Sequence, residues 1–318
     1  MIGAIDIGGT KIALALATPE GRLVAHDRFP TDPGRGPTAV IDEMIVTLRC
    51  LADKHGAVLT TIGVGSVGPL DLATGTIMSP PNFPGWKHVP LKLPLEAAFK
   101  VPVVIDNDAN AAALGEYRLG AGKGARCMVY ATLSTGIGGG VVIGGKLLHG
   151  VGGGAGEFGH QTIVPDGPAC GCGNHGCFEA VASGTAIARR ARILAEAGQA
   201  PLMLALAGGE PAALHAGHVA EAAAQGEATA MALWAETVEY LAIGLGNVIS
   251  TLAPDRVVLG GGVAQVGDAL LVPLREALAR RVRMVPMDQV QVVLAAHGHE
   301  TGLYGAVALA LEHARPHA

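Results

Sequence analysis

Apolar and polar residues follow one another along the chain in blocks that predict alternating strands and helices. Strands are predicted where short apolar runs are bounded by turn residues, at 2–7, 12–17, 23–29, 58–64, 101–105, 127–133, 139–143, 257–259 and 290–295. Helices are predicted where apolar side chains recur at helical spacing, at 38–55, 109–119, 183–197, 219–225, 227–251 and 302–314. A further helix is predicted between Gly262 and the strand at 290–295. Because the two kinds of element alternate in both halves, we expect an α/β protein with central sheets.

One plan, a strand followed by a glycine-rich turn and a second strand, occurs twice, at residues 2–17 and 127–143. The first turn runs from Asp6 to Lys11, and its glycines are expected to supply the positive φ of a tight hairpin. The second turn, Ser134 to Gly140, has the same chemistry without the carboxylate. A single such turn is more often an ordinary hairpin, whereas two facing turns would bracket a polyphosphate.

The composition of the 318 residues narrows the class of protein. Half of them are hydrophobic and 15% are charged, which is typical of a globular chain, and the formal net charge is −5. No basic run is longer than the Arg280-Arg281 pair, so nucleic acid is not an expected partner. The apolar runs are too short for a bilayer, and Asp6 within the first run argues against a signal peptide. The cytoplasm is the expected location.

Three of the five cysteines, Cys170, Cys172 and Cys177, fall within eight residues. Thiolates and imidazole suit a tetrahedral structural zinc, and a disulfide framework is disfavoured by the odd cysteine count. Either His160 or His175 could be the fourth ligand. The tight turn from residue 173 to residue 176 leaves His175 little freedom to point inward, which favours His160. Two carboxylates, Glu157 and Glu179, flank the cluster and are not needed as zinc ligands. The zinc loop is therefore expected to present these acidic side chains to another binding partner.

Two further segments carry candidate chemistry. Residues 106–110 are Asp-Asn-Asp-Ala-Asn directly after a predicted buried strand, where one polar residue suffices as a helix cap. We therefore expect a functional role for at least one of them, such as a carboxylate that takes a proton from a hydroxyl. The proline-rich segment from Ser79 to Trp86 is either a surface loop held by the tryptophan or a wall of a polyol site that includes Asn82.

A dinucleotide-type fingerprint and a P-loop were also considered. Residues 63–68 match G-x-G-x-x-G after a predicted strand, but Pro69 and further turn residues follow instead of a helix. Without a helix N-terminus to receive a pyrophosphate, the match is weak. The Walker pattern is absent from the sequence, so phosphate handling of the P-loop kind is not expected.

In their order along the chain, these motifs resemble the ROK family of sugar kinases and related repressors, and within it the glucokinase branch. The resemblance rests on the motifs at 6–11, 107–110, 134–140, 157–160, 170–179 and 260–262, with 81–86 and 164–167 similar to that branch. It implies the two-domain actin/hexokinase-like ATPase fold (ribonuclease H-like) with an inserted structural zinc loop. We expect residues 1–119 plus 302–318 to form a small domain and 120–301 a large one.

The resemblance also implies roles for individual residues. Asp108 would be the general base that takes the proton of the attacking sugar hydroxyl. Hexose contacts would come from Asn82, Asn107, Asp108, Glu157, His160 and Glu179. Zinc would be held by His160, Cys170, Cys172 and Cys177, and magnesium in part by Asp6. The nucleotide would contact Asp6, Gly8, Gly9, Thr10, Lys11, Thr135, Gly136, Gly138, Gly261 and Gly262.

The activity implied is transfer of the γ-phosphoryl group of ATP, with Mg²⁺, to the 6-hydroxyl of a hexose, glucose first. Phosphoryl transfer needs positioning and charge neutralisation more than covalent chemistry. Kinases of N-acetylmannosamine, N-acetylglucosamine, fructose or allose are alternatives within the family. A sugar-sensing protein without activity is a second alternative, although the chain starts directly on the first strand of the nucleotide domain. A homodimer or homotetramer is also implied.

Overall fold

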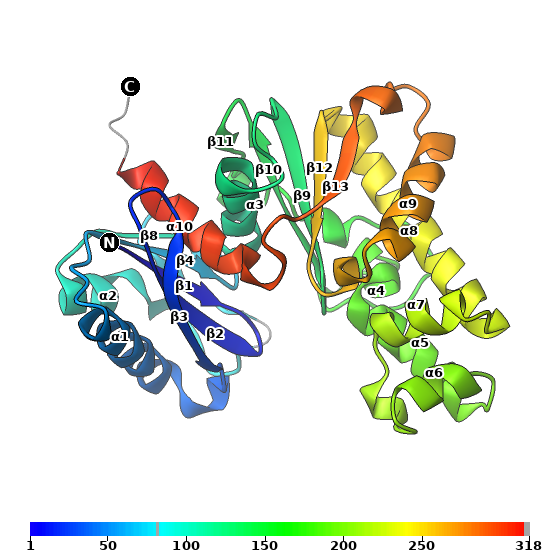
Figure 1. Ribbon diagram of the computed structural model, residues 1–318, viewed down its shortest axis with the longest axis horizontal. Coiled ribbons are helices and arrows are strands. Elements are labelled where there is room, and N and C mark those ends of the chain that lie inside the picture. Colours follow the sequence, from blue (N-terminus) through cyan, green and yellow to red (C-terminus); the bar gives the residue numbers. More distant parts are fainter. Residues whose placement is uncertain (81–82, 315–318) are drawn as a thin grey trace. The chain divides into compact units, whose positions relative to one another are not determined.

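The computed structural model describes residues 1–80 and 83–314 (Figure 1). The chain divides into two compact units. The first contains Met1–Gly124, Gly140–Ala155 and the residues from His299 onward, and the second contains Ala125–Gly139 and Gly156–Gly298. The sequence prediction had joined residues 140–155 to the second half, because a continuous run of chain gives no sign that one strand passes from one unit into the other.

The first unit is built on a five-stranded sheet of order β3-β2-β1-β4-β8. Its strands are β1 (Ile2–Ile7), β2 (Lys11–Ala17), β3 (Leu23–Pro30), β4 (Thr61–Ser66) and β8 (Val103–Asn107). The first three form an antiparallel meander, while β1, β4 and β8 are parallel. The parallel strands therefore bring their carboxyl ends to one edge of the sheet, which is where ligands bind in open α/β sheets.

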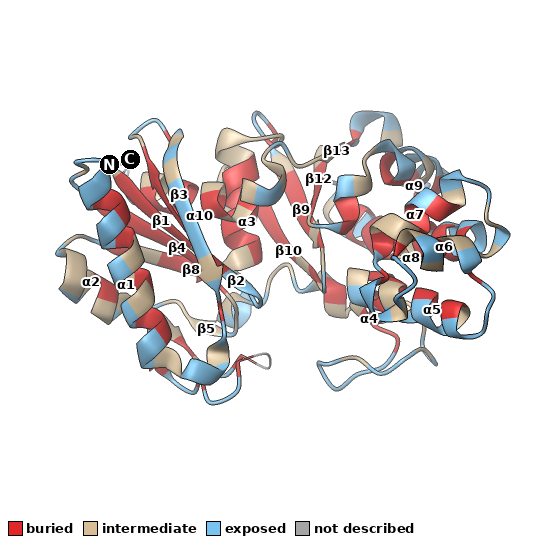
Figure 2. Cartoon of the chain, turned by 60° about the horizontal axis from the view of Figure 1, so that its bottom comes forward, coloured by how far each residue is buried: buried red, intermediate tan, exposed pale blue. Residues whose placement is uncertain are grey.

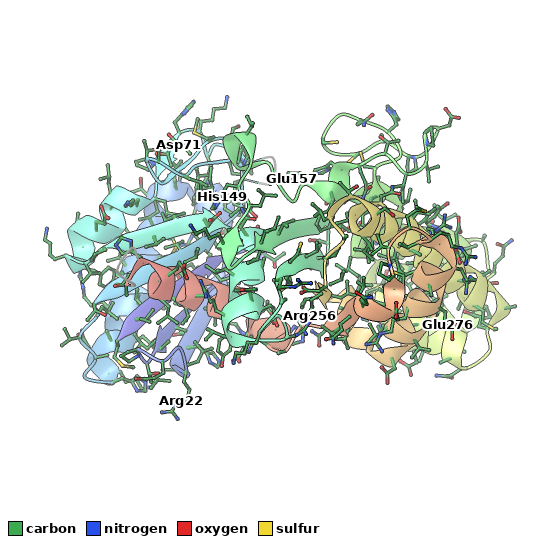
Figure 3. The ribbon with its side chains drawn as sticks, turned by 90° about the horizontal axis from the view of Figure 1, so that it is seen from above. Arg22, Asp71, His149, Glu157, Arg256 and Glu276 are labelled. Atoms are coloured by element: carbon green, nitrogen blue, oxygen red, sulfur yellow. The ribbon has the colours of Figure 1, made fainter. Side chains whose placement is uncertain are left out.

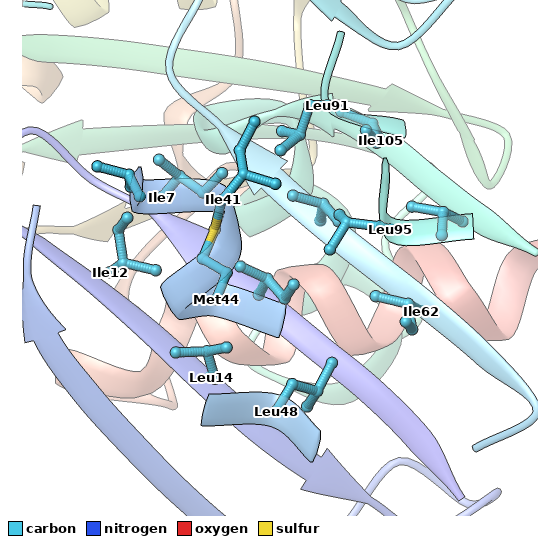
Figure 4. Close-up of a cluster of buried hydrophobic side chains, with 14 of the residues drawn as sticks. Ile7, Ile12, Leu14, Ile41, Met44, Leu48, Ile62, Leu91, Leu95 and Ile105 are labelled. Carbon is cyan, nitrogen blue, oxygen red and sulfur yellow. The ribbon is translucent and has the colours of Figure 1, made fainter. Parts of the chain in front are cut away.

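Helices cover both faces of this sheet. Helices α1 (Pro37–Lys54) and α2 (Lys92–Phe99) pack on one face, where Ile5 and Ile7 of β1 join the main core cluster. Figure 4 shows Ile7 in this cluster beside Ile41 and Met44 of α1. On the other face, α10 (Thr301–His313) packs against Ile2 and Ala4, and α3 (Asp108–Leu119) packs beside α10. Side chains alternate along a strand, so Asp6 falls on the α10 face with Ile2 and Ala4.

The second unit contains most of a second sheet of order β11-β10-β9-β12-β13. Its strands are β9 (Cys127–Leu133), β10 (Ile137–Ile143), β11 (Lys146–Leu147), β12 (Arg256–Gly260) and β13 (Gln291–Leu294), and the boundary between the units falls within β10. Strands β9, β12 and β13 are parallel. Figure 2 shows these central strands as mostly buried, as expected from their continuous apolar runs.

The helices of the second unit follow the zinc-type cluster in the sequence. They are α4 (Phe178–Ala182), α5 (Gly184–Glu196), α6 (Pro201–Leu206), α7 (Ala216–Ala224), α8 (Ala228–Leu252) and α9 (Asp268–Arg281). Pro273 lies inside α9 and cannot donate to the carbonyl of Ala269. The indole N–H of Trp234 on α8 donates to that carbonyl at 2.9 Å, so the packing of α8 on α9 satisfies it.

The predicted α/β architecture is confirmed, and the long elements lie within a few residues of their predicted bounds. The short elements had no prediction: these are α2, α4, α6, β5 (Leu70–Asp71), β6 (Thr76–Ile77), β7 (Val89–Pro90) and β11. Two-residue strands have no periodicity to detect, and Pro94 in α2 hides a helical pattern. In the described part of the chain, the helices lack the combined length and apolarity that a membrane span requires.

The first glycine-rich turn forms the predicted hairpin, but the predicted role of its glycines is wrong. The hairpin of β1 and β2 is present, but neither Gly8 nor Gly9 has the positive φ that was expected of them. A side-chain carbon at Gly9 would meet nothing within 4 Å, so glycine is not required there by the packing either. Glycine instead leaves the backbone of this turn bare, as a close approach to an anion requires.

Candidate functional site

Strand β8 ends and helix α3 begins at the segment that carries the predicted general base. Asn107 is the N-cap of α3, and its side-chain oxygen accepts from the backbone N–H of Ala109 at 2.9 Å and of Asn110 at 3.3 Å. Asp108 is the first residue of the helix, and its Oδ1 also accepts from the Ala109 N–H, at 2.8 Å. A carboxylate in the first turn is stabilised by the helix dipole. The predicted segment therefore does supply a helix cap, through Asn107, whose amide nitrogen has no hydrogen-bond partner among the described residues.

Asp106, one residue before the cap, is a buried carboxylate with three partners. Its Oδ1 accepts from the backbone N–H of Asn107 at 2.7 Å and from Nδ2 of Asn110 at 3.1 Å. Its Oδ2 lies 2.7 Å from Nε2 of His149, a residue labelled in Figure 3. This hydrogen bond raises the pKa of His149 above its ordinary value, against the opposing effect of partial burial. This pair has no local signature in the sequence, because its members are 43 residues apart.

The first glycine-rich turn lies at the same edge of the sheet. Asp6 of β1, Gly65 of β4 and Asp106 of β8 stand in one register across three parallel strands. A side-chain carbon at Gly65 would lie 3.6 Å from the Cα of Asp108 and 3.8 Å from Oδ1 of Asp6. The first unit therefore brings together the predicted base and the predicted magnesium ligand on either side of β4. At Gly65, a residue of the rejected fingerprint, the tightest contact of such a carbon would be with Cβ of Ala111 on α3, at 3.3 Å.

The carboxylate of Asp6 also lies against the first turn of α10. A side-chain carbon at Gly302 would overlap both carboxylate oxygens of Asp6. Burial raises the pKa of Asp6 to about 6, and the positive charge of Lys11 works in the opposite direction. The protein's own groups therefore do not fully compensate the negative charge of Asp6, which is a property expected of a carboxylate that binds a cation. The turn that follows is closed by the Gly8 N–H, which donates to the carbonyl of Lys11 at 3.0 Å.

The proline-rich segment can be placed only in part. Asn82, a predicted hexose contact, lies outside the described residues. Trp86 is 1% exposed, packs edge-to-face on Phe83 with ring centroids 5.0 Å apart, and donates to the carbonyl of Pro33 at 3.3 Å. The tryptophan is therefore part of the core that holds this segment, rather than a wall of a polyol site.

In the second unit, one group of residues has the make-up of a zinc site: the donor atoms of His160, Cys170, Cys172 and Cys177 all lie within 4.8 Å of one another. All five cysteines of the chain are free thiols. His175 is not part of the group and is exposed on the bridge that pairs it with Ala169. The choice of His160 over His175 as the histidine of the cluster agrees with this geometry.

The spacings inside this cluster fit a tetrahedral ion. Zn–S bonds of about 2.3 Å and Zn–N bonds of about 2.0 Å give tetrahedral edges of about 3.8 Å between sulfurs and about 3.6 Å between sulfur and nitrogen. The Sγ atoms of Cys172 and Cys177 are 3.7 Å apart, and Sγ of Cys170 is 3.6 Å from Nδ1 of His160. Burial, followed by the neighbouring thiols, raises the pKa of Cys177 to about 12, so this thiol needs a cation to become a thiolate.

The predicted sugar-facing residues of the second unit stand on both sides of the cluster. His160 turns Nδ1 toward the thiols and Nε2 toward Glu157, whose Oε2 is 3.8 Å away. The two nitrogens of this imidazole thus have separate surroundings, as the expected dual role requires. Glu179, in the first turn of α4, accepts from the backbone N–H of Ile137 at 2.8 Å through one oxygen. That bond fixes its carboxylate against the second glycine-rich turn.

This second turn borders a cavity of about 380 Å³ within the second unit. Thr135 and Gly262, two predicted nucleotide contacts from distant parts of the chain, both line it, together with the N-termini of α5 and α7. Gly261 has φ +84°, and a side-chain carbon there would overlap the backbone of Leu133. At Gly136, it would overlap the carboxylate of Glu179. Gly261 is therefore required by its backbone conformation and by close packing on a backbone, whereas a side chain at Gly136 would displace the carboxylate of Glu179.

Comparison with known proteins extends this picture to the whole chain. Residues 2–313 match the ROK family. A glucokinase of Streptomyces coelicolor is 39% identical over 97% of this chain and 96% of its own length. An N-acetylmannosamine kinase of Escherichia coli is 37% identical over 96% of this chain and 97% of its own.

Among solved structures, a ROK family glucokinase from Streptomyces griseus in complex with glucose and AMPPNP superposes with a TM-score of 0.85. It is 37% identical, and the match covers 98% of this chain and 99% of that one. The fold is thus the two-domain α/β fold of the sugar kinases, with a Cys₃His cluster that fits a structural zinc. The chain belongs to the ROK family, which confirms the predicted resemblance.

Proposed function

We propose that this protein is an ATP- and Mg²⁺-dependent hexokinase that transfers the γ-phosphoryl group to the 6-hydroxyl of glucose. The observation that carries the proposal is the match at 39% identity to a curated glucokinase along almost the whole of both chains. A match of this extent runs along almost the whole of both chains, so the proposal does not depend on one motif.

Asp108 is the general base in this proposal. It begins α3 at the carboxyl end of a parallel strand, and Asp106 and Asn107 fix the backbone around it. A carboxylate held in this way can accept the proton of the sugar hydroxyl as the hydroxyl attacks phosphorus. The chemistry asks little more of the protein than this positioning and the neutralisation of charge on the phosphoryl oxygens.

The hexose would be held by Asn82, Asn107, Glu157, His160 and Glu179. A site that pairs each hydroxyl with a fixed polar group discriminates against analogues that lack one. Zinc would act as a structural ion that orders residues 160–177 and so fixes the ring of His160, since four protein ligands leave no open coordination position. The second oxygen of Glu179 can accept from a sugar hydroxyl, because the first is bonded to Ile137.

The nucleotide would contact the two bare turns, through Gly8, Gly9, Thr10 and Lys11 in one unit and Thr135, Gly136 and Gly138 in the other. Gly261 and Gly262 would pass beneath the adenosine, and the cavity lined by Thr135 and Gly262 supports this placement. Magnesium would be held in part by Asp6, an oxygen ligand of the kind that this ion prefers. The ion would neutralise charge on the phosphates.

A second candidate is phosphorylation of N-acetylmannosamine, because the Escherichia coli kinase of that name is nearly as similar to this chain as the glucokinases are. The two sugars differ at carbon 2, by an acetamido group in place of a hydroxyl and by its orientation. A pocket that closes on a hydroxyl excludes the larger group, so kcat/KM on the two sugars separates the candidates clearly.

The test is a coupled assay of ADP release with ATP and Mg²⁺ across a panel of sugars: glucose, N-acetylmannosamine, N-acetylglucosamine, fructose and allose. We expect kcat/KM to be highest for glucose by at least about tenfold, and the product to carry phosphate on the 6-oxygen by ³¹P NMR. A higher kcat/KM for another sugar would identify that sugar as the preferred substrate in place of glucose. If calorimetry shows that a sugar binds but no ADP is formed from ATP with any sugar of the panel, the protein would be a non-catalytic sensing member of the family.

A further inference from the structure

The imidazole of His149 connects two parts of the first unit that are distant in sequence. Its Nε2 lies 2.7 Å from Oδ2 of Asp106 at the end of β8. Its backbone carbonyl accepts from the N–H of Ala155 at 2.9 Å, which closes the neck of the glycine-rich loop between the two residues. The side chain of His149 thus connects the base of the 149–155 loop to the end of β8, directly before Asp108.

Asp106 is a buried carboxylate that depends on its hydrogen-bond partners. It is 4% exposed, and a buried carboxylate is costly unless hydrogen bonds and an opposite charge compensate it. Its other two partners are neutral donors, the N–H of Asn107 and Nδ2 of Asn110. The Oδ1 of Asn110 is itself buried without a hydrogen-bond partner, so that side chain has no further anchor through its oxygen. Among the described residues, His149 is the one partner that can give this carboxylate a charge-assisted hydrogen bond.

We propose that His149 is the positioning residue for the general base: it holds Asp106, and Asp106 in turn fixes the backbone that aims Asp108 at the sugar hydroxyl. The inference rests on the proposed kinase function, in which Asp108 is the base. His149 is assigned no contact with substrate. Its effect is transmitted through the Asp106 carboxylate to the N–H of Asn107 and the side chain of Asn110, which stand on either side of Asp108.

A second histidine in the same unit shows what an ordinary surface pair looks like. Nδ1 of His26 is 3.8 Å from Oε1 of Glu300, and the two side chains are 60% and 47% exposed. Pairs of this kind contribute little, because water screens the charges. The pair of His149 and Asp106 differs in the two properties that matter, since its contact is 2.7 Å long and its carboxylate side chain is 6% exposed. His26 therefore provides a matched control.

The kinetic test compares His149→Ala, His149→Gln and His26→Ala with the wild-type protein. In His149→Ala, we expect kcat to fall about 10- to 100-fold with the KM for ATP unchanged, because a small displacement of a catalytic group carries a cost of this size. The amide of Gln can donate from the place of Nε2, so His149→Gln should recover kcat to within about fivefold of wild type. His26→Ala should match wild type. Equal losses in His149→Ala and His149→Gln would overturn the proposal.

A double-mutant cycle then tests whether the effect passes through Asp106. Asp106→Asn keeps an acceptor for the N–H of Asn107 but loses the charge that binds His149. If the two residues act as a unit, His149→Ala combined with Asp106→Asn should be no slower than the slower single variant, to within about threefold. Multiplication of the two losses would mean that His149 acts elsewhere, and would refute the inference.

Hydrogen exchange followed by mass spectrometry separates the inference from the proposed function. In His149→Ala, the amides of residues 103–112 should exchange at least about tenfold faster than in wild type, while His26→Ala leaves them unchanged. This result is independent of which sugar is phosphorylated. Unchanged exchange would overturn the inference even in an active kinase. If no hexose is phosphorylated but the exchange rises as expected, the proposed function fails while the mechanical link from His149 to the segment stands.

Discussion

The sulfur atoms of Cys172 and Cys177 lie 3.7 Å apart, which is the length of one edge of a tetrahedron of thiolates around zinc. The other measured edge, from Cys170 Sγ to His160 Nδ1, is 3.6 Å and agrees with the shorter zinc–nitrogen bond. The donor atoms of the cluster therefore have the spacing of a tetrahedral metal site, although His160 and Cys170 are ten residues apart in the sequence. Thiol chemistry alone would not favour this arrangement, because burial and neighbouring thiols hold Cys177 in its protonated form.

Cys172→Ser is therefore expected to lose tightly bound zinc, whereas His175→Ala should retain one zinc per chain by metal analysis of the purified protein. The affinity for glucose should fall together with the metal in Cys172→Ser, because zinc orders the loop that carries His160. Calorimetric titration with glucose measures this. A protein that loses zinc while its Kd for the sugar stays unchanged would show that the loop does not form part of the sugar site.

Replacement of Asp108 by Asn should lower kcat by about 10²- to 10⁴-fold, which is the range for loss of a general base. Asn is the sharper choice than Ala, because it keeps an oxygen that can accept from the N–H of Ala109 and so preserves the start of α3. Zinc content and the midpoint of thermal unfolding should match wild type. A variant that keeps more than about a third of the wild-type kcat would remove Asp108 from this role.

Sequence reasoning reached the α/β class, the long elements and the zinc cluster, because each of these has a local signature. Apolar periodicity marks a long helix, and clustered cysteines mark a metal loop. It did not reach His149, whose one informative contact joins residues 43 positions apart and leaves no trace in spacing. The surroundings of Gly65 were not predictable for the same reason, since its neighbours Asp6 and Ala111 come from distant parts of the chain.

Asp106→Asn should lower the pKa of His149 toward the ordinary value of 6.5, because the hydrogen bond to the carboxylate is the main cause of its elevation. In wild type, the charged pair contributes to stability below about pH 6.5 and loses that contribution as the pH rises through the elevated pKa. Titration of the histidine ring carbons by NMR measures the shift, and the other histidines of the chain serve as internal references. An unchanged pKa of His149 in the variant would mean that the pair does not form in solution.

The buried carboxylate of Asp6 lowers the stability of the folded protein when it is ionised. Its pKa is raised to about 6 by burial, so at neutral pH the folded protein carries a carboxylate that would be easier to ionise in the unfolded chain. This charge destabilises the metal-free protein by an amount on the order of 3 kcal/mol, since the pKa rises from 3.8 to about 6 and one pKa unit corresponds to about 1.4 kcal/mol. Proteins commonly accept such a loss of stability at sites where function requires a charge.

Asp6→Asn should therefore unfold at a higher temperature than wild type in the absence of magnesium and nucleotide, while its kinase activity falls by at least about 100-fold. The gain should be fully present above about pH 6, where the wild-type carboxylate is ionised in the folded protein, and should shrink as the pH falls toward 4. Calorimetric scans at several pH values test this. Asp42→Asn, which removes an exposed carboxylate from α1, is the control and should change neither stability nor activity appreciably. A less stable Asp6→Asn would mean that the charge of Asp6 is compensated within the fold, and the case for a cation at this carboxylate would lose its physical basis.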